Sequence, residues 1–494
     1  MIGTRLRELS PSDLRPSAEA LKAGGGRLQF AYAWTPPAGG LEVRYVCTVP
    51  GRREFETWVV AGHRELPSLA PILPLIGWYE REIMDLYGLS FTDHPEPYPL
   101  VLRPGDGTHL NGHDLGHPGI DGAGPRNGQP HLPDVDAADV QYLPFGPIRA
   151  DVLESAEFTF LYVGEHIIHY HPRLFFKHRG MEMCFEGEDP RLGAIIAERV
   201  SAVGSLAHAL AYCEAVERAA GCEVPPRAKA LRVLLAELER LYNHLHYLGH
   251  LCHTTTLKVG EAQGKLLEET AKQLNARLTG SRFLRGLITP GGLRRDLDPR
   301  AWLGDALEAL RQDYVAYADR LEASESHLDR LITTGSLPER IAFDQGATGP
   351  IERASGLDRD LRRDHAYAGY DGLPLTVPVL RDGDAYARQR VRMAEIEASF
   401  ALCQRVLLLL EPSPVRADCR PAPGTAGLGW AEGPRGSLFY AVHIGPDGRL
   451  ARVKIKSPSF SNWRAFPFTV HDSNMMDYAI NEASFGLTMA GCDR

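Results

Sequence analysis

Apolar and polar residues alternate in short runs near the N-terminus, over residues 28–32 and again over residues 42–49, between Gly/Pro turns. Because the side chains of a strand point alternately to its two faces, this period predicts antiparallel strands within residues 28–62. Residues 68–86 have helical periodicity instead, which ends before Gly88. We therefore predict a small α+β domain over residues 1–102.

The periodicity disappears after residue 102. Eight glycines and five prolines lie within residues 103–139, together with His109, His113, His117 and His131. Such a composition is typical of a connector. A metal-binding histidine tract is the alternative, but no Cys and no ordered helix would bring these four histidines together. We predict a Gly/Pro/His-rich linker over residues 103–143.

The remainder of the chain, residues 144–494, is dominated by helical periodicity. Apolar residues recur at helical spacing over 190–220, 227–253, 258–278, 300–334 and 384–410. Strand patterns flank these helices at 157–163, 166–171, 436–443 and 450–455. Long helices with apolar faces bury one another, so we predict a large, mainly α-helical bundle with marginal β-strands. The fold class of the whole chain is α+β.

Composition and charge narrow the function classes. Among the 494 residues, 54 Lys and Arg face 63 Asp and Glu, which gives a net charge of −9. No basic block is present that would follow a phosphate backbone, so nucleic acid is not an expected partner. The chain contains no G-x-x-x-x-G-K-[ST] loop and no G-x-G-x-x-G sequence opening a helix. Nothing in it therefore predicts a nucleotide site.

The N-terminus, the apolar runs and the cysteines together indicate the cellular compartment of the protein. Residues 1–21 carry a charge every few positions, and the richest apolar run, residues 406–410, stops at Glu411. Neither a signal peptide nor a membrane span is expected. The eight cysteines are irregularly spaced with no C-x-x-C pair. We expect reduced thiols and a cytoplasmic protein.

One long motif in the first domain resembles the signature of a known protein family. Residues 78–91 read WYEREIMDLYGLSF and are followed by His94-Pro95. This stretch closely resembles the signature of the C-type peripheral subunit of respiratory complex I, the NADH-quinone oxidoreductase. Its acidic residues, Glu80, Glu82 and Asp85, are expected to form an interface surface on a helix rather than a catalytic acid pair.

The second domain resembles the D-type subunit of complex I and the large subunits of membrane-bound [NiFe] hydrogenases of the formate hydrogenlyase type. The matching stretches occur in order along the chain, at 145–147, 178–182, 197–200, 223–228, 290–296, 353–356, 383–388, 433–436 and 493–494. The resemblance implies a [NiFe]-hydrogenase-large-subunit-like fold for residues 144–494. A fused C–D chain is a known arrangement in hydrogenase-type relatives.

The resemblance fails at the metal ligands. In the hydrogenase branch two C-x-x-C pairs hold the Ni-Fe centre, because soft thiolates suit these metals. Here the first pair is replaced by Ser201 and Gly204, and the second by Thr488 and Gly491, with Cys492 one residue out of register. We predict that the chain binds no Ni-Fe centre, no other metal and no cofactor of its own.

Complex I uses the corresponding cavity for the quinone headgroup, and the polar residues that the resemblance places there have also changed. The loop that carries a His reads Gly146-Pro147-Ile148-Arg149-Ala150, the Tyr position is Ala202, and the Asp position is approximately Thr254. Arg149 still has hydrogen-bond donors, but it stays charged and cannot perform the same acid-base chemistry. A quinone therefore remains only an alternative ligand.

Three cations match family positions near the iron-sulfur cluster of a neighbouring small subunit: Arg199, His178 and Arg179. Positive charge there would raise the reduction potential of the cluster. The alternative is that they hold the bundle together through carboxylates such as Glu182 and Glu198.

Histidines also crowd one predicted helix, at positions 244, 246, 250 and 253. Three of them share a face, but no carboxylate lies near them in the sequence to complete a metal site. We expect hydrogen-bonded packing histidines.

The resemblance implies a peripheral-arm subunit of a membrane-associated redox complex that couples electron transfer to ion translocation, without a Ni-Fe centre. The expected partners are an iron-sulfur small subunit, antiporter-like subunits and other membrane subunits, through which the chain would attach to the cytoplasmic face of the inner membrane. Two alternatives stay open: a quinone reductase subunit that uses Arg149 and Ser201, and a redox-inactive scaffold that couples membrane subunits. Whether the chain takes part in a reaction also stays open.

Overall fold

The computed structural model describes residues 3–37, 39–102, 139–149 and 154–494. Its N-terminal part is built around a four-stranded sheet with the order β1–β4–β3–β2. Strands β2, β3 and β4 are antiparallel, as the alternating pattern predicts, and β1 joins β4 in parallel. The elements are β1 (Thr4–Glu8), α1 (Pro11–Ala23), β2 (Arg27–Trp34), β3 (Glu42–Thr48), β4 (Phe55–Ala61), β5 (Glu65–Pro67), the 3-10 turn η1 (Pro74–Ile76), α2 (Gly77–Tyr87) and β6 (Ser90–Thr92).

Helix α2 carries the residues of the C-type motif, and it ends at Gly88 in the left-handed conformation (φ 64°), which glycine adopts at little cost. The motif's acidic residues do not lie on an exposed surface: Glu80, Glu82 and Asp85 are all buried. Asp85 accepts hydrogen bonds from the backbone of residues 100–102, and Glu82 pairs with Lys454 from the far end of the chain. They are therefore structural residues inside the fold.

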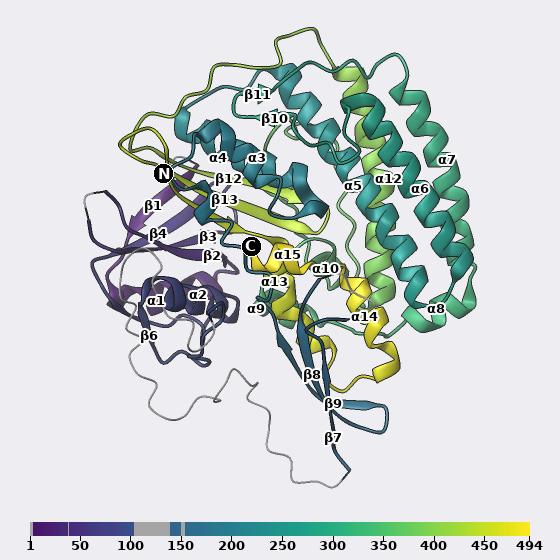
Figure 1. Cartoon of the computed structure of the whole chain (residues 1–494), viewed down its shortest axis with the longest axis horizontal. Coiled ribbons are helices and arrows are strands. Elements are labelled where there is room, and N and C mark those ends of the chain that lie inside the picture. Colours follow the sequence, from purple (N-terminus) through teal and green to yellow (C-terminus); the bar gives the residue numbers. More distant parts are fainter. Residues whose placement is uncertain (1–2, 38, 103–138, 150–153) are drawn as a thin grey trace.

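A bundle of four long helices forms the opposite side of the molecule (Figure 1). These helices are α5 (Pro226–Thr254), α6 (Lys258–Thr279), α7 (Leu303–Glu322) and α12 (Ala385–Leu409). Two of the predicted helices are interrupted: 300–334 divides into α7 and α8 (Glu325–Leu331), and 190–220 divides into α3 (Pro190–Ala197) and α4 (Ser205–Ala220). Shorter helices follow at α9 (Glu339–Gln345), α10 (Pro350–Ala354) and α11 (Leu361–Asp364).

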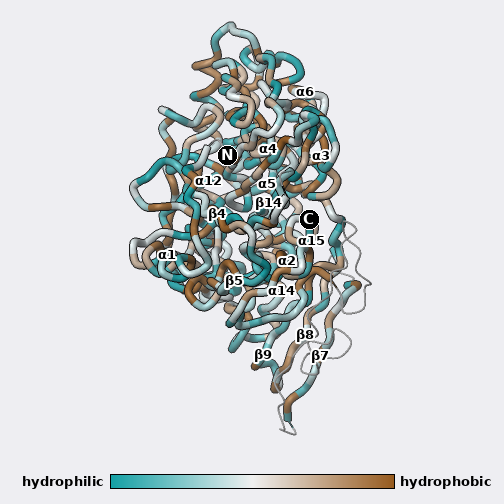
Figure 2. Tube along the Cα trace, turned by 90° about the vertical axis from the view of Figure 1, so that its left-hand side faces the viewer, coloured by the Kyte–Doolittle hydropathy of each residue, from teal (hydrophilic) through white to brown (hydrophobic). Residues whose placement is uncertain are grey.

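Two further three-stranded sheets complete the C-terminal part. The central sheet contains β12 (Ala426–Gly433), β13 (Gly436–Ile444) and β14 (Leu450–Lys456), and the second contains β7 (Gln141–Phe145), β8 (Glu157–Val163) and β9 (His166–Arg173). The second sheet projects from one end of the molecule (Figures 1 and 2). β7 begins inside the range predicted as linker, 103–143; residues 103–138 of that range lie outside the described residues.

Helix α4 lies directly on β12 because that strand has glycines where the two elements touch. A Cβ at Gly427 would lie 2.0 Å from the carbonyl oxygen of Ala215, and one at Gly429 would lie 2.1 Å from that of Ala211. Any side chain there would push the helix off the sheet. The central sheet and α4 together fix the segment that precedes α4, where two of the vacated ligand positions lie.

The remaining elements of the C-terminal part are short. They are the strand pair β10 (Ile288–Thr289) and β11 (Gly292–Leu293), the 3-10 turns η3 (Met183–Phe185), η4 (Ala202–Gly204), η5 (Phe466–Thr469) and η6 (Met475–Asp477), and the helices α13 (Pro458–Ala465), α14 (Tyr478–Phe485) and α15 (Met489–Asp493).

The N-terminal and C-terminal parts share one apolar core. A buried ionic network also crosses between them: the Lys454 ammonium lies 2.6 Å from Glu82 and 3.0 Å from Glu182, and the Arg494 guanidinium lies 2.9 Å from Glu82. Removal of one ion from such a network leaves the others buried and uncompensated. The two parts are therefore locked together in one molecule.

Across the described segments, no single helix is long and apolar enough to cross a membrane. Residues 190–197 and 202–220 pass a length and composition test as a pair, but they are bent by 108° at the break between them, and most residues of α4 are buried inside the protein.

Candidate functional site

The four vacated ligand positions meet in the folded chain. Ser201, Gly204, Thr488 and Gly491 line one cavity of about 20 Å³ near the centre of the molecule. The rest of its lining comes from His208, from the β12–β13 turn, and from the start of α13; these residues are Val203, Gly433, Pro434, Arg435, Leu438, Ser457, Pro458 and Ser459. The two distant segments that resemble the hydrogenase ligand pairs therefore lie together in the folded chain.

The first pair lies at the break between α3 and α4. Ser201 and Gly204 have non-helical backbone angles, φ −145° with ψ 128° and φ −154° with ψ 37°. A buried carboxylate of α5 caps the N-terminus of α4: Glu239 accepts hydrogen bonds from the backbone N–H groups of Leu206 (2.8 Å) and Ala207 (2.9 Å). Burial raises the pKa of Glu239 to about 7. This internal cap explains why the predicted continuous helix is interrupted here.

The second pair lies at the start of α15, where a hydroxyl caps the helix. Thr488 Oγ1 accepts a hydrogen bond from Gly491 N (3.2 Å) and lies 3.1 Å from Ser459 Oγ. Glu154 adds a carboxylate to the same helix end, since it accepts hydrogen bonds from the backbone N–H groups of Met489 and Ala490. A Cβ at Gly491 would lie 2.6 Å from Thr488 Oγ1. The hydroxyl of Thr488 thus occupies space beside the second position.

The donors at these positions do not suit a nickel-iron centre. Two hydroxyls and two glycines provide no thiolate, whereas soft sulfur ligands select such metals. Three helix N-termini reach the cavity, because Gly204, Ser457 and Thr488 cap α4, α13 and α15. Such helix ends favour negative charge. Here Glu239 and Glu154 satisfy the N–H groups of α4 and α15, which removes the electrostatic need for anionic metal ligands.

His208 and Arg435 supply the remaining polar chemistry of the cavity wall. His208 Nδ1 is hydrogen-bonded to the Tyr440 hydroxyl at 2.8 Å, and burial lowers the pKa of His208 to about 3, so that the ring is neutral. Burial and then the nearby Arg392 guanidinium lower the pKa of Arg435 to about 10, so this side chain remains a cation. The Arg435 guanidinium donates to the carbonyl oxygen of Gly486. The cavity is therefore positive, and its described lining contains no base that is half-ionised near neutral pH.

The other quinone-position candidates do not line this cavity. The Arg149 guanidinium is buried against Glu482, with nitrogen–oxygen distances of 2.9 and 3.2 Å, and stacks over Phe145 and Phe158. Ala202 is exposed. Thr254 ends α5 and donates from its hydroxyl to the Leu251 carbonyl oxygen at 2.8 Å. Of the four candidate cavity residues, only Ser201 lines the cavity.

The three predicted cluster-facing cations do lie together. Arg179 donates to the carbonyl oxygens of Arg199 (3.0 Å) and Ala490 (3.2 Å), so it joins the two ligand-pair segments from outside. His178 donates to the carbonyl oxygen of Asp493 at 2.7 Å. The Arg199 side chain is 55% exposed and contacts Glu198 at 3.3 Å. All three side chains make structural contacts, and the Arg179 and Arg199 guanidinium groups present positive charge at the surface. Their position next to a cluster stays a prediction.

The histidines of α5 have carboxylate partners from the neighbouring helix. His246 lies 2.9 Å from Glu268 and His253 lies 3.0 Å from Glu261, both on α6, whereas the ring of His250 stacks between them. The local sequence does not show these carboxylates, because they come from another helix. Among the described residues, no group of three or more His, Cys, Asp or Glu is arranged to hold a metal ion.

Sequence reasoning missed several residues of the cavity, namely Arg435, Ser457 and Ser459, and gave His208 no role. Arg435 lies inside the Gly433–Gly436 motif, so its proximity was available from the resemblance. Ser457-Pro458-Ser459 also has a recognisable pattern, a helix-capping Ser followed by Pro. Only the tertiary fold brings these residues to the vacated positions.

Three family models match the chain. The respiratory-chain NADH dehydrogenase 30 Kd subunit model matches residues 8–118, and the 49 Kd subunit model of the same enzyme matches residues 267–426 and 418–494. A nickel-dependent hydrogenase model matches residues 179–279, which include the first vacated pair.

Individual proteins similar to this chain also include both hydrogenase-type and complex-I-type subunits. Formate hydrogenlyase subunit 5 of Escherichia coli (strain K12) is 32% identical over 437 residues, covering 85% of this chain and 75% of the relative. The fused C/D subunit of the NADH-quinone oxidoreductase of Acidiphilium cryptum (strain JF-5) is 27% identical over 495 residues, covering 88% and 81%. A chain in the solved structure of the membrane-bound sulfane sulfur reductase, an archaeal respiratory membrane complex, is 26% identical with a TM-score of 0.67, covering 72% of this chain and 99% of that one. These matches confirm the predicted α+β, [NiFe]-hydrogenase-large-subunit-like fold.

Proposed function

The chain belongs to the family of fused C/D-type subunits, which are homologous to the 30 and 49 Kd subunits of complex I and related to formate hydrogenlyase large subunits. From this membership we propose that it is the peripheral-arm subunit of a membrane-bound respiratory or energy-converting redox complex. We also propose that it works without a Ni-Fe centre. In this proposal it couples electron transfer in a partner to ion movement in membrane subunits.

The observation that carries the proposal is the state of the central cavity. All four positions that would hold the metal centre line it, yet they carry Ser, Gly, Thr and Gly, and the space left is about 20 Å³. That is about the volume that one water molecule needs. Neither the donors nor the space favours chemistry on a metal centre at this point.

Electron transfer is proposed to occur in a partner subunit. Arg199 and Arg179 present positive charge beside the cavity, with the ring of His178 near them. The family resemblance implies an iron-sulfur cluster of the small subunit next to these residues. On the other side, antiporter-like and other membrane subunits are the proposed partners, which would hold the chain at the cytoplasmic face of the inner membrane.

A redox-inactive scaffold is the second candidate function. The small cavity favours it, because about 20 Å³ is room for about one water molecule. The quinone reductase alternative has less support. It needs Arg149 and Ser201 at one ligand, whereas Arg149 is engaged by Glu482 and does not line the cavity with Ser201.

Purification of the native complex tests the proposal. We expect mass spectrometry to identify an iron-sulfur subunit and membrane subunits, and a potentiometric titration to show a cluster that is reduced reversibly. Turnover with a soluble quinone, lost in Ser201→Ala but not in the exposed-site control Ala202→Ser, would favour the quinone reductase instead. A complex with membrane subunits and no cluster-bearing partner would support the scaffold and contradict the redox role.

A further inference from the structure

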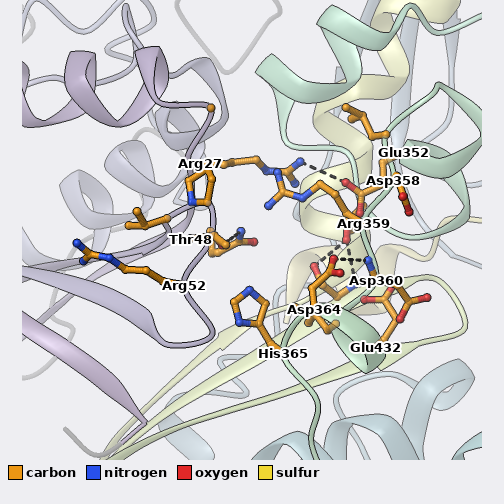
Figure 3. Close-up of a pocket in the computed structure, with 18 of the residues that line it drawn as sticks. Arg27, Thr48, Arg52, Glu352, Asp358, Arg359, Asp360, Asp364, His365 and Glu432 are labelled. Atoms are coloured by element: carbon orange, nitrogen blue, oxygen red, sulfur yellow. Dashed lines mark hydrogen bonds and ion pairs between the residues drawn. The ribbon is translucent and has the colours of Figure 1, made fainter. Parts of the chain in front are cut away.

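A second, much larger cavity lies at the seam between the N-terminal and C-terminal parts. Its volume is about 600 Å³, within the range of pockets that hold small organic ligands. One wall comes from β2 and the β3–β4 hairpin, and the other from residues 343–365 and the turn end of the β12–β13 hairpin (Figure 3). Pockets of this size at the boundary of two structural units are frequent ligand sites.

Four of the carboxylates that line this cavity form ion pairs with arginines behind them. Asp360 lies 2.7 Å from Arg362, and Glu432 lies 3.1 Å from Arg353. Asp358 and Asp364 lie 2.7 Å from the two ends of one guanidinium, that of Arg363. Burial also raises the pKa of Glu432 to about 7. Arg363 balances only one of its two carboxylates, so the acidic groups of this wall are largely, but not completely, compensated.

The cations that face the cavity are not neutralised to the same degree. Arg27 is 3% exposed; it donates to the carbonyl oxygen of Ala347 (2.8 Å) and lies 3.4 Å from Glu352, but its Nε has no partner within the described part of the chain. The Arg359 guanidinium makes no hydrogen bond or ion pair to any residue in the described ranges, although the Arg359 carbonyl accepts from Arg353. Figure 3 shows the Arg27 and Arg359 side chains reaching toward one another from opposite walls.

Two facing guanidinium groups repel each other. Burial and then the charge of Arg359 lower the pKa of Arg27 to about 10. Lys456 is buried behind the same wall and donates to the Ser437 carbonyl oxygen at 3.0 Å. Burial and then the charge of Arg27 lower its pKa to about 7, so it adds only part of a positive charge near neutral pH. Oxygen anions are the natural complement, because a guanidinium binds carboxylate or phosphate through parallel N–H···O bonds.

We propose that the seam cavity binds a small anion through phosphate or carboxylate oxygens held between Arg27 and Arg359. The volume leaves room for a body larger than the anionic group, which would rest against Phe343 and Leu357 on the same lining. This inference does not depend on the proposed redox function, since it concerns a different cavity.

Isothermal titration calorimetry on the full chain, at constant ionic strength, tests the site with two probes, inorganic phosphate and citrate. We expect saturable binding of at least one probe, and the stronger one identifies the anionic group as phosphate or carboxylate. Arg359→Gln should weaken that binding about tenfold or more, because hydrogen bonds to charged groups are among the strongest. The matched control Arg420→Gln, at a 75% exposed arginine outside the cavity, should leave it unchanged.

A second measurement separates binding from folding. Because the Arg359 guanidinium has no partner among the described residues, we expect Arg359→Gln to leave the anion-free unfolding midpoint unchanged or to raise it, and to abolish the rise in midpoint that the anion causes in the wild type. Absence of saturable binding by both probes would overturn the proposal. Equal binding by the wild type and Arg359→Gln would overturn it as well.

Discussion

The residues at the second pair of vacated ligand positions, Thr488 and Gly491, have structural roles in the fold. The Thr488 hydroxyl caps α15, and the hydroxyl of the neighbouring Ser459 lies against it. Gly491 leaves room for that contact, whereas Gly204 is unconstrained, since a Cβ there would approach only His208, at 3.8 Å. The second ligand segment is thus packed around its hydroxyls, and restoring single cysteines would not restore a metal site.

Glu239 provides a residue-scale test of the internal cap on α4. Its folded pKa, about 7, lies above the 4.5 of an unperturbed Glu, so the folded state binds more protons between those values. The free energy of unfolding should therefore fall as pH rises from about 4.5 to about 7, by a few kcal/mol at most, and stay level above that. Glu239→Gln should remove this part of the slope, which denaturant unfolding at several pH values measures. Identical slopes in both proteins would refute the assigned pKa.

Arg199 provides a residue-scale test of the cluster-facing surface. In the intact complex, Arg199→Gln removes a positive charge near the proposed cluster, so the midpoint potential of that cluster should become more negative, by on the order of tens of mV. Potentiometric titration followed by electron paramagnetic resonance measures the shift. Arg340→Gln, at a 92% exposed arginine of α9, is the control. A shift equal to that of the control would indicate that Arg199 only braces Glu198.

At the scale of elements, periodicity predicted most helices and strands but not where a helix is interrupted. The break at residues 198–204 depends on Glu239 of another helix, and the meeting of α13 with α15 depends on the final fold. The spacing of hydrophobic residues predicts which face of a helix is buried. It does not predict which distant carboxylate caps the end of that helix. The vacated pairs were found by resemblance. Arg149 and Thr254, which the same resemblance placed beside them, do not line the cavity, and local sequence does not fix their tertiary neighbours.

The contact of α4 with β12 gives a prediction at this scale. Gly429→Ala places a methyl group where the Ala211 carbonyl oxygen already lies, so we expect a loss of stability on the order of 3 kcal/mol or more. Gly204→Ala is the matched control, because its new methyl group would make only an ordinary contact. Thermal unfolding of both variants provides the comparison. Similar midpoints would mean that α4 does not need this close approach.

At the scale of the whole molecule, two modules have become one folded unit. Their shared core and the Glu82–Lys454–Glu182 network hold the seam at one end, and the anion cavity lies elsewhere along it. Polar residues of β2, among them Arg27 and Gln29, are buried because the C-terminal part covers this edge strand. The alternating pattern of β2 did not predict that burial, since the covering residues come from the far end of the chain.

The seam network can be tested by Lys454→Met. The variant leaves two buried carboxylates with fewer cations, so it should lower the free energy of unfolding by about 3–5 kcal/mol. Lys265→Met, at an exposed ion pair with Glu261, should cost less than about 1 kcal/mol. Denaturant unfolding of the full chain measures both. An equally small loss in the two variants would contradict a locked seam.

The central claim is that this member of the family works without a Ni-Fe centre, and the nickel content of the native complex tests it most directly. We predict that inductively coupled plasma mass spectrometry of the purified complex finds iron from a partner's cluster and nickel far below one atom per chain. One nickel per chain, retained after chelation and gel filtration, would contradict the account.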